Sequence, residues 1–213
     1  MAETTKTREA FLAAVHIAVK LLSQPEVAAA WDRMSSLQEF TVAGLAGHLF
    51  RCCTGVLGYL DAPTPEGDPI AGPSYYVDAL ERDLQSPDNV AIRLRGESTA
   101  AAGPRALADE LGRRIVTLED RLEAETEDRT LAVYRGLVMR LDDYLETRIV
   151  EILVHVDDLA LSAGLGTPEL PPRSLNIALR HLLAVARMRS GDIAVLRAFA
   201  RRERDEIEAL RVF

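Results

Sequence analysis

The sequence RIVEILVHVDDL (residues 148–159) decides the fold of this chain. Glu151 and His155 lie four positions apart, about one turn of a helix, so their side chains share one helix face. The rest of the stretch is so apolar that we expect the helix to be buried, and buried polar groups need partners. A carboxylate and an imidazole that converge on one point are typical of two ligands of a divalent metal. We therefore expect a third ligand from elsewhere in the chain.

The polar residues of this helix form one stripe. Tyr144, Arg148, Glu151, His155 and Asp158 follow one another at intervals of four, three, four and three, and the remaining positions are mostly aliphatic. A solvated face is the simpler interpretation, but the aliphatic residues leave little other surface to expose. Asp158 could accept the second N–H of His155, and Arg148 could balance Glu151 or receive a substrate carboxylate. Either residue could instead form an ordinary helix ion pair.

His48 is the candidate for the third ligand. It lies beside the apolar stripe of an expected helix over 42–60, which could face the helix of Glu151 across a bundle interior. Two histidines and one carboxylate are the ligands of open catalytic zinc sites, which keep a position for water or a substrate sulfur. His48 could also be an ordinary core histidine. Cys52 could be a fourth ligand or a redox-sensitive neighbour, but we expect core packing; His16 and His181 are expected to be structural.

Apolar periodicity predicts four long helices, at 7–22, 42–60, 104–125 and 142–162. Thr41 is a suitable N-cap for the second, and Pro104 fits the first turn of the third. Residues 61–74, rich in proline and glycine, predict a loop before a short helix over 75–84, and residues 130–138 could be extended. A C-terminal helical pair is expected to divide near residues 190–191. No further helix is predicted between 84 and 104.

These elements indicate an all-α fold, an antiparallel four-helix bundle with extra C-terminal helices. We expect residues 1–213 to form a single domain, with its core at about 7–166 and a C-terminal helical extension at about 173–210. A chain of 213 residues that is 48% hydrophobic can bury one substantial core.

Composition restricts the possible partners and the compartment. Charged residues interrupt every apolar stretch before membrane-spanning length, and the first six residues are polar, so we expect a cytoplasmic protein without a membrane partner. The adjacent Cys52 and Cys53 suit reducing conditions. A net charge of −8 argues against nucleic-acid binding. The sequence contains neither a glycine-rich phosphate loop nor a nucleophile elbow.

Several motifs together resemble a known family. Trp31, Ser35, FTV (40–42), GLAGHL (44–49) and RIVEILVHVDDL (148–159) resemble the mycothiol-dependent maleylpyruvate isomerase N-terminal (metal-binding) family of the DinB-like superfamily. The similarity spans about residues 25–166. It implies a DinB-like four-helix bundle in which His48, Glu151 and His155 map one by one onto the three metal ligands of the family.

The resemblance also implies a chemistry. In this family the metal binds the thiol of mycothiol and stabilises it as a thiolate, which attacks an electrophilic carbon. We therefore expect a metal-dependent thiol S-transferase that uses Zn²⁺, with Ni²⁺ or Fe²⁺ also compatible, mycothiol or another small thiol, and an electrophilic small molecule. Phe40 stands where the family often has tryptophan. The resemblance also implies that the isomerase carries a second, C-terminal domain that contributes to its active site. Only about two helices follow residue 172 here, so we expect a reaction other than maleylpyruvate isomerisation.

The sequence is also compatible with two other functions. The chain could be a non-enzymatic metal-binding helical module for dimerisation or sensing, in which Cys52 completes the coordination shell. It could also bind an apolar small molecule in the bundle core, independently of metal. Exposed C-terminal helices would also suit a homodimer.

Overall fold

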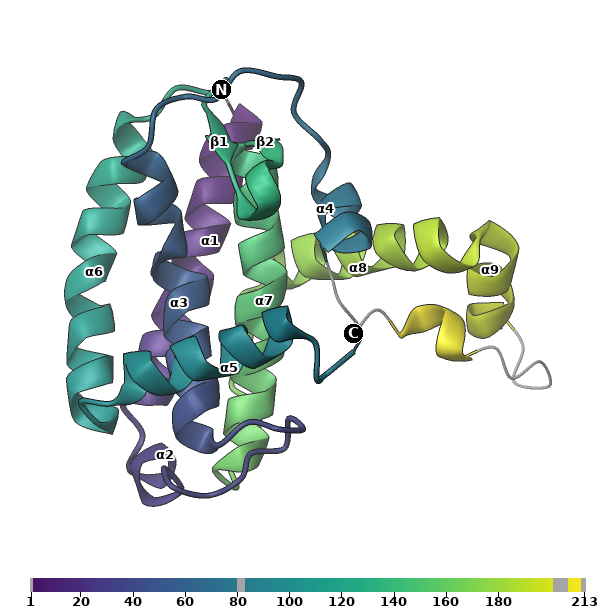
Figure 1. Cartoon of the computed structure of the whole chain (residues 1–213). Helices are drawn as coiled ribbons and strands as arrows, with labels where there is room; N and C mark the ends of the chain where they lie inside the picture. Colours follow the sequence, from purple (N-terminus) through teal and green to yellow (C-terminus); the bar gives the residue numbers. More distant parts are fainter. Residues whose placement is uncertain (1, 80–82, 201–206, 212–213) are drawn as a thin grey trace.

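The computed structural model describes residues 2–79, 83–200 and 207–211, and four long helices form its main body (Figure 1). These are α1 (Ala2–Leu22), α3 (Val42–Leu60), α6 (Pro104–Ala124) and α7 (Leu141–Ser162). Each corresponds to one helix predicted from the sequence, although α1 begins at residue 2 rather than at residue 7. The expected all-α, DinB-like class is confirmed.

Shorter elements connect and extend the bundle. They are α2 (Pro25–Ala29), α4 (Gly72–Ala79), α5 (Pro87–Ala100), β1 (Thr130–Ala132), η1 (Tyr134–Gly136), β2 (Val138–Arg140), α8 (Pro172–Ser190), α9 (Asp192–Ala200) and η2 (Ile207–Leu210). The segment expected to be extended is an antiparallel hairpin of β1 and β2, and the C-terminal pair divides between Ser190 and Asp192 as expected. Among the described helices, none combines the length and the apolar character needed to cross a membrane.

The chain direction within the bundle follows from its long connection. In Figure 1, α1 and α7 run in one direction and α3 and α6 in the other. Helices α3 and α6 can be parallel because residues 61–103, which include α4 and α5, return the chain to the other end of the bundle. Helix α7 contacts both α1 and α3, and α6 contacts the same two helices. The polar stripe of α7 faces α3, because the ring of His155 lies 4.8 Å from that of His48.

Local signals explain where the bundle helices begin. The Thr41 hydroxyl accepts a hydrogen bond from the Gly44 N–H at 2.9 Å, which confirms the expected N-cap of α3. Pro104 occupies the first turn of α6 as expected. The apolar positions whose periodicity predicted these helices are buried: Phe11, Val15, Ala18 and Leu22 on α1, Val42, Leu45, Leu49, Cys52 and Val56 on α3, and Leu107, Leu111, Ile115, Leu118 and Leu122 on α6.

Helix α4 differs from its predicted bounds. It begins at Gly72, three residues before the expected start, and Leu84 lies in a turn beyond it. The predicted residues 80–82 lie outside the described residues. Tyr76 is fully buried, and its hydroxyl donates to the Thr147 carbonyl at 2.8 Å, so α4 is anchored on α7.

Helix α5 was not predicted, because it has no continuous apolar stripe. Its buried residues are Gly96 and Ala100, and it crosses the outer side of α3 by close backbone approach (Figure 1). A Cβ atom on Gly47 would overlap the Gly96 carbonyl group. The start signals are local: the Ser86 hydroxyl accepts from the Asn89 N–H at 3.3 Å, and Pro87 occupies the first turn.

The glycine contact predicts an asymmetry between two substitutions in α3. Gly47→Ala should destabilise the protein by about 1–3 kcal/mol, because the added methyl group has to displace the backbone of α5. Gly58→Ala is the matched control, since nothing lies within 4 Å of a Cβ there, and it should stabilise by about 0.5–1 kcal/mol. Urea denaturation measures both, and equal effects would contradict the close approach of α3 and α5.

Candidate metal centre

Four potential ligands converge between two neighbouring helices. His48 and Cys52 come from α3, Glu151 and His155 from α7, and in each pair one helical turn separates the two residues. One ligand atom from each of the four lies within 4.8 Å of the others. The structure thus brings together the three residues selected from the sequence. It adds Cys52, which is at the same time buried in the core as expected.

The two nitrogens of His155 face different partners. Nδ1 lies 3.2 Å from Oδ2 of Asp158, and Nε2 lies 3.4 Å from Oε2 of Glu151. A ring N–H directed at a carboxylate fixes the tautomer and leaves the other nitrogen for the site. Asp158 is therefore placed to orient His155, as the spacing on the helix suggested. Whether it acts in this way on a bound metal stays a prediction.

His48 lies across from His155. The ring centroids are 4.8 Å apart in an edge-to-face arrangement, and Cys52 Sγ is 3.7 Å from His48 Nε2. The Phe40 ring lies 5.9 Å from the His48 ring and covers it from the side of the α2–α3 connection. The Nε2 atom of His48 thus points into the cluster.

The electrostatics of the site are set by one buried carboxylate. Burial alone would raise the pKa of Glu151, but the hydrogen bond with His155 and the positive charge of Arg148 lower it to about 2. Burial would lower the pKa of His155, yet its hydrogen bonds to Asp158 and Glu151 raise it to about 9. Burial, reinforced by the charge of His155, lowers the pKa of His48 to about 3. An ionised Glu151 therefore faces a protonated His155 and a neutral His48.

The thiol of Cys52 is protonated in this environment. Burial raises its pKa to about 12, and the negative charge of Glu151 contributes in the same direction. Only a strong positive charge in the cluster would convert this thiol to a thiolate.

Arg148 is held by aromatic rings next to the cluster. Its guanidinium lies 5.0 Å from the ring centroid of Tyr144 and 5.7 Å from that of Tyr75, and Nε donates to the Thr147 hydroxyl at 3.1 Å. Its charge lowers the pKa of Glu151, which agrees with a charge-balancing role. Binding of a substrate carboxylate by Arg148 stays a prediction.

A comparison with known protein families identifies the segment that contains this cluster. A family model described as the mycothiol maleylpyruvate isomerase N-terminal domain matches residues 11–160. The chain belongs to this family. Comparisons with curated proteins and with solved structures give no match. The matched segment includes all four cluster residues and ends before α8, so the site lies within the mycothiol maleylpyruvate isomerase N-terminal domain and the C-terminal helices lie outside the match.

The donor set of this family member fits a divalent metal ion. Two imidazoles, a carboxylate and a thiol are the ligand types of Zn²⁺ sites, and they converge here from two rigid helices. The alternative of a solvated polar face does not hold for the stripe on α7, because Tyr144 is 4% and His155 9% exposed. The stripe is an interior feature of the bundle.

The other histidines do not join the cluster. His16 is half exposed, with Nε2 3.9 Å from Glu119 on α6. His181 on α8 is buried, with Nδ1 3.5 Å from Glu146 and its ring against Tyr76. Both placements agree with the structural roles expected for them.

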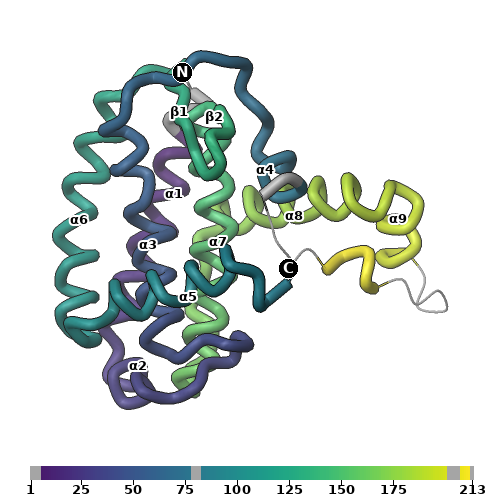
Figure 2. Tube along the Cα trace, viewed as in Figure 1, coloured from purple at the N-terminus to yellow at the C-terminus, as the bar shows by residue number. Residues whose placement is uncertain are grey.

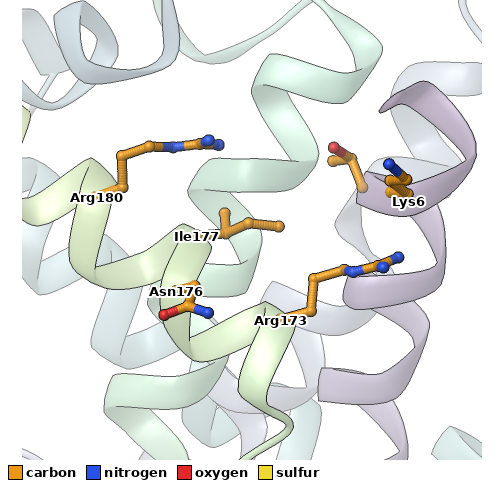
Figure 3. A pocket seen from close by; sticks show the side chains of 6 residues that line it. Lys6, Arg173, Asn176, Ile177 and Arg180 are labelled. Carbon is orange, nitrogen blue, oxygen red and sulfur yellow. The ribbon is translucent and has the colours of Figure 1, made fainter. Parts of the chain in front are cut away.

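A separate basic pocket lies between α1 and α8. It measures about 390 Å³ and is lined by Lys6, Thr7, Arg173, Asn176, Ile177 and Arg180. Figure 3 shows Arg173 and Arg180 extending from α8 into this pocket. Arg173 pairs with Glu9 at 3.2 Å and Arg180 with Glu146 at 2.8 Å. None of the four cluster residues lines it, so these two arginines belong to a different surface from the candidate metal centre.

The contribution of α4 to the site was not predicted from the sequence. Tyr75 supports Arg148, and the Tyr76 hydroxyl donates to the Thr147 carbonyl of α7 at 2.8 Å. The available signal was a pair of adjacent tyrosines after a loop rich in proline and glycine. Nothing in that signal indicates which part of the bundle the pair contacts.

The charge coupling in the site predicts a change in one titration. In metal-free protein, Glu151→Gln should lower the pKa of His155 from about 9 toward its ordinary value near 6.5, because a neutral amide no longer favours the imidazolium. Heteronuclear NMR of the ring measures this. The raised pKa contributes stability that is complete below pH 6.5 and is lost as the pH rises through 9.

The control for this titration is Glu119→Gln, which alters an exposed carboxylate near His16. It should leave the titration of His155 unchanged. An identical His155 titration in wild type and Glu151→Gln would contradict the geometry.

Proposed function

We propose that this protein is a metal-dependent thiol S-transferase that uses mycothiol or a similar small thiol against an electrophilic small molecule. The observation that supports it is the convergence of four ligand atoms within 4.8 Å, inside the segment that matches the mycothiol maleylpyruvate isomerase N-terminal domain. His48, Glu151 and His155 would hold the ion. Zn²⁺ suits this donor set best, and Ni²⁺ or Fe²⁺ is compatible with it.

Each residue around such a site would have a separate role. A divalent ion bound there would lower the pKa of a thiol, so that the thiolate is available as a nucleophile at neutral pH. Glu151 supplies the negative charge that attracts the cation. Asp158 keeps the His155 ring oriented, with Nε2 directed into the cluster. Arg148, fixed by its tyrosines, would orient an anionic group of the substrate or of the thiol.

Cys52 decides between an open and a closed site. In the enzyme, Cys52 would remain a protonated side chain beside the ion, consistent with its raised pKa, and one coordination position would be left for the cosubstrate thiol. The second candidate function, a non-enzymatic metal-binding module, is favoured by the presence of Cys52 in the same cluster. Four protein ligands would close the coordination shell, and the ion would then stabilise the fold.

Metal content tests the site itself. Untagged wild-type protein should contain nearly stoichiometric metal by elemental mass spectrometry, and His48→Ala and Glu151→Ala should lose it because each removes one ligand. His16→Ala is the matched control, since His16 lies on α1 outside the cluster and should not affect the metal content. Wild-type protein that binds no metal even after reconstitution would refute the site.

Turnover separates the two functions. Metal-loaded wild type should consume thiol in the presence of an electrophile, whereas Glu151→Ala should fall to the uncatalysed rate. Cys52→Ala should keep both metal and turnover if the site is open. Loss of metal and of thermal stability in Cys52→Ala, together with background turnover in wild type, would instead support the closed, non-enzymatic site.

A further inference from the structure

The C-terminal helices form an arm that projects from the bundle. This arm consists of residues 172–200 and 207–211, which include α8, α9 and η2. Figures 1 and 2 show α8 leaving the bundle beside α7 and carrying α9 and η2 away from the four long helices. The three elements contact one another, and Val185, Ala186, Val195 and Ala209 are buried. The arm is therefore packed, so the side chains that it exposes lie on a formed surface.

Exposed large apolar side chains are concentrated on this arm. Among the described residues, eight of the fourteen such side chains lie between Leu175 and Ile207. The other six lie singly on six different segments of the bundle and its connections, as is normal for a protein surface. On the arm they recur at helical spacing, every four positions on α8 and every three on α9. These two exposed stripes are Leu175, Leu179 and Leu183 on α8, and Ile193, Leu196 and Phe199 on α9.

The area of the exposed stripes is that of an interface. The six residues are 37–68% exposed. Together they present roughly 600 Å² of apolar surface, the upper limit for the largest apolar patch of a typical monomer. A stable interface takes roughly 800 Å² from each partner, of which a little over half is apolar. The exposed stripes therefore supply the apolar area that one side of such an interface needs.

A second copy of the chain carries the matching surface. Apolar side chains are best covered by other apolar side chains, and in the described part of the chain the arm is where they are concentrated. A two-fold axis brings the same patch of both copies together, so one set of stripes serves both sides of the interface.

The charges of the arm are compatible with this pairing. The arm is rich in arginine, and two basic arms would repel each other if these charges were uncompensated. Four of its arginines are in ion pairs within the chain: Arg173 with Glu9, Arg180 with Glu146, Arg187 with Asp192, and Arg211 with Glu208. Each copy thus compensates much of its own positive charge.

We propose that the exposed stripes of α8 and α9 form a homodimer interface, in which the arm of each copy packs against the arm of the other. This surface lies outside residues 11–160, which match the family model, and none of its residues belongs to the metal cluster. The inference therefore does not depend on the proposed function.

Sedimentation velocity of the full chain tests the dimer. Wild type should have twice the mass of one chain at micromolar concentration. Phe199→Glu should raise the dimer dissociation constant by more than roughly tenfold, because it places a carboxylate in an apolar contact. The matched control is Leu94→Glu on α5, since Leu94 and Phe199 are 65% and 68% exposed, and this variant should remain dimeric. A monomeric wild type, or an equally stable dimer in Phe199→Glu, would overturn the proposal.

A second variant guards against loss of folding. If the circular dichroism of Phe199→Glu differs from that of wild type, Leu179→Glu tests the stripe of α8 in its place, with the same expected result. Equal dimer stability in this variant would contradict the interface.

Photo-cross-linking identifies the surface that covers the arm. Benzoylphenylalanine in place of Phe199 should give a covalent dimer with cross-links to residues 172–211 of the second copy. Cross-links to the bundle, residues 2–162, would overturn the pairing of arm with arm. Dimerisation and metal content can fail separately: a dimer without metal refutes only the proposed function, and a monomer with metal refutes only this interface.

Discussion

The burial of one carboxylate constrains the centre of this molecule. Glu151 lies on the inner face of α7, where an uncompensated charge would be strongly destabilising. Compensation comes from His155 on the same helix and from Arg148 one turn earlier, whose guanidinium lies against the Tyr75 ring of α4. A stripe that would be unfavourable on its own thus becomes a reason for α4 to pack where it does, and α4 in turn lies against α8.

The other half of the site depends on backbone packing rather than on charge. His48 lies on the turn of α3 where α5 crosses, and the crossing uses glycines on both helices. One end of the bundle, where α1 begins and α3 and α6 end, is fixed by arginines: Arg8 donates to the carbonyls of Leu122 and Glu125 at the end of α6, and Arg129 donates to that of Ala62 after α3. These contacts hold the helices together at that end, while the crossing of α5 braces α3 next to His48.

How much could be predicted from the sequence differs between these features for physical reasons. The long helices and the convergence of His48 with Glu151 and His155 could be predicted, because apolar periodicity fixes which face of each helix is buried. Helix α5 could not, since Gly96 packs by the absence of a side chain and leaves no apolar stripe. The hydrogen bond from Tyr76 to the Thr147 carbonyl spans 71 positions and depends on how the connection folds back, which no local pattern records.

The protonation states bear on whether three or four protein ligands would be used. A cation bound by His48, Glu151 and His155 has to displace one proton, from His155, whose pKa of about 9 makes this cost about 3 kcal/mol at pH 7. Recruiting Cys52 as well requires a second proton to leave a group with a pKa of about 12, a further cost of about 7 kcal/mol that the metal–sulfur bond would have to offset. The three-ligand arrangement therefore requires the smaller proton release. It is also the arrangement that keeps a position for a thiol from solution.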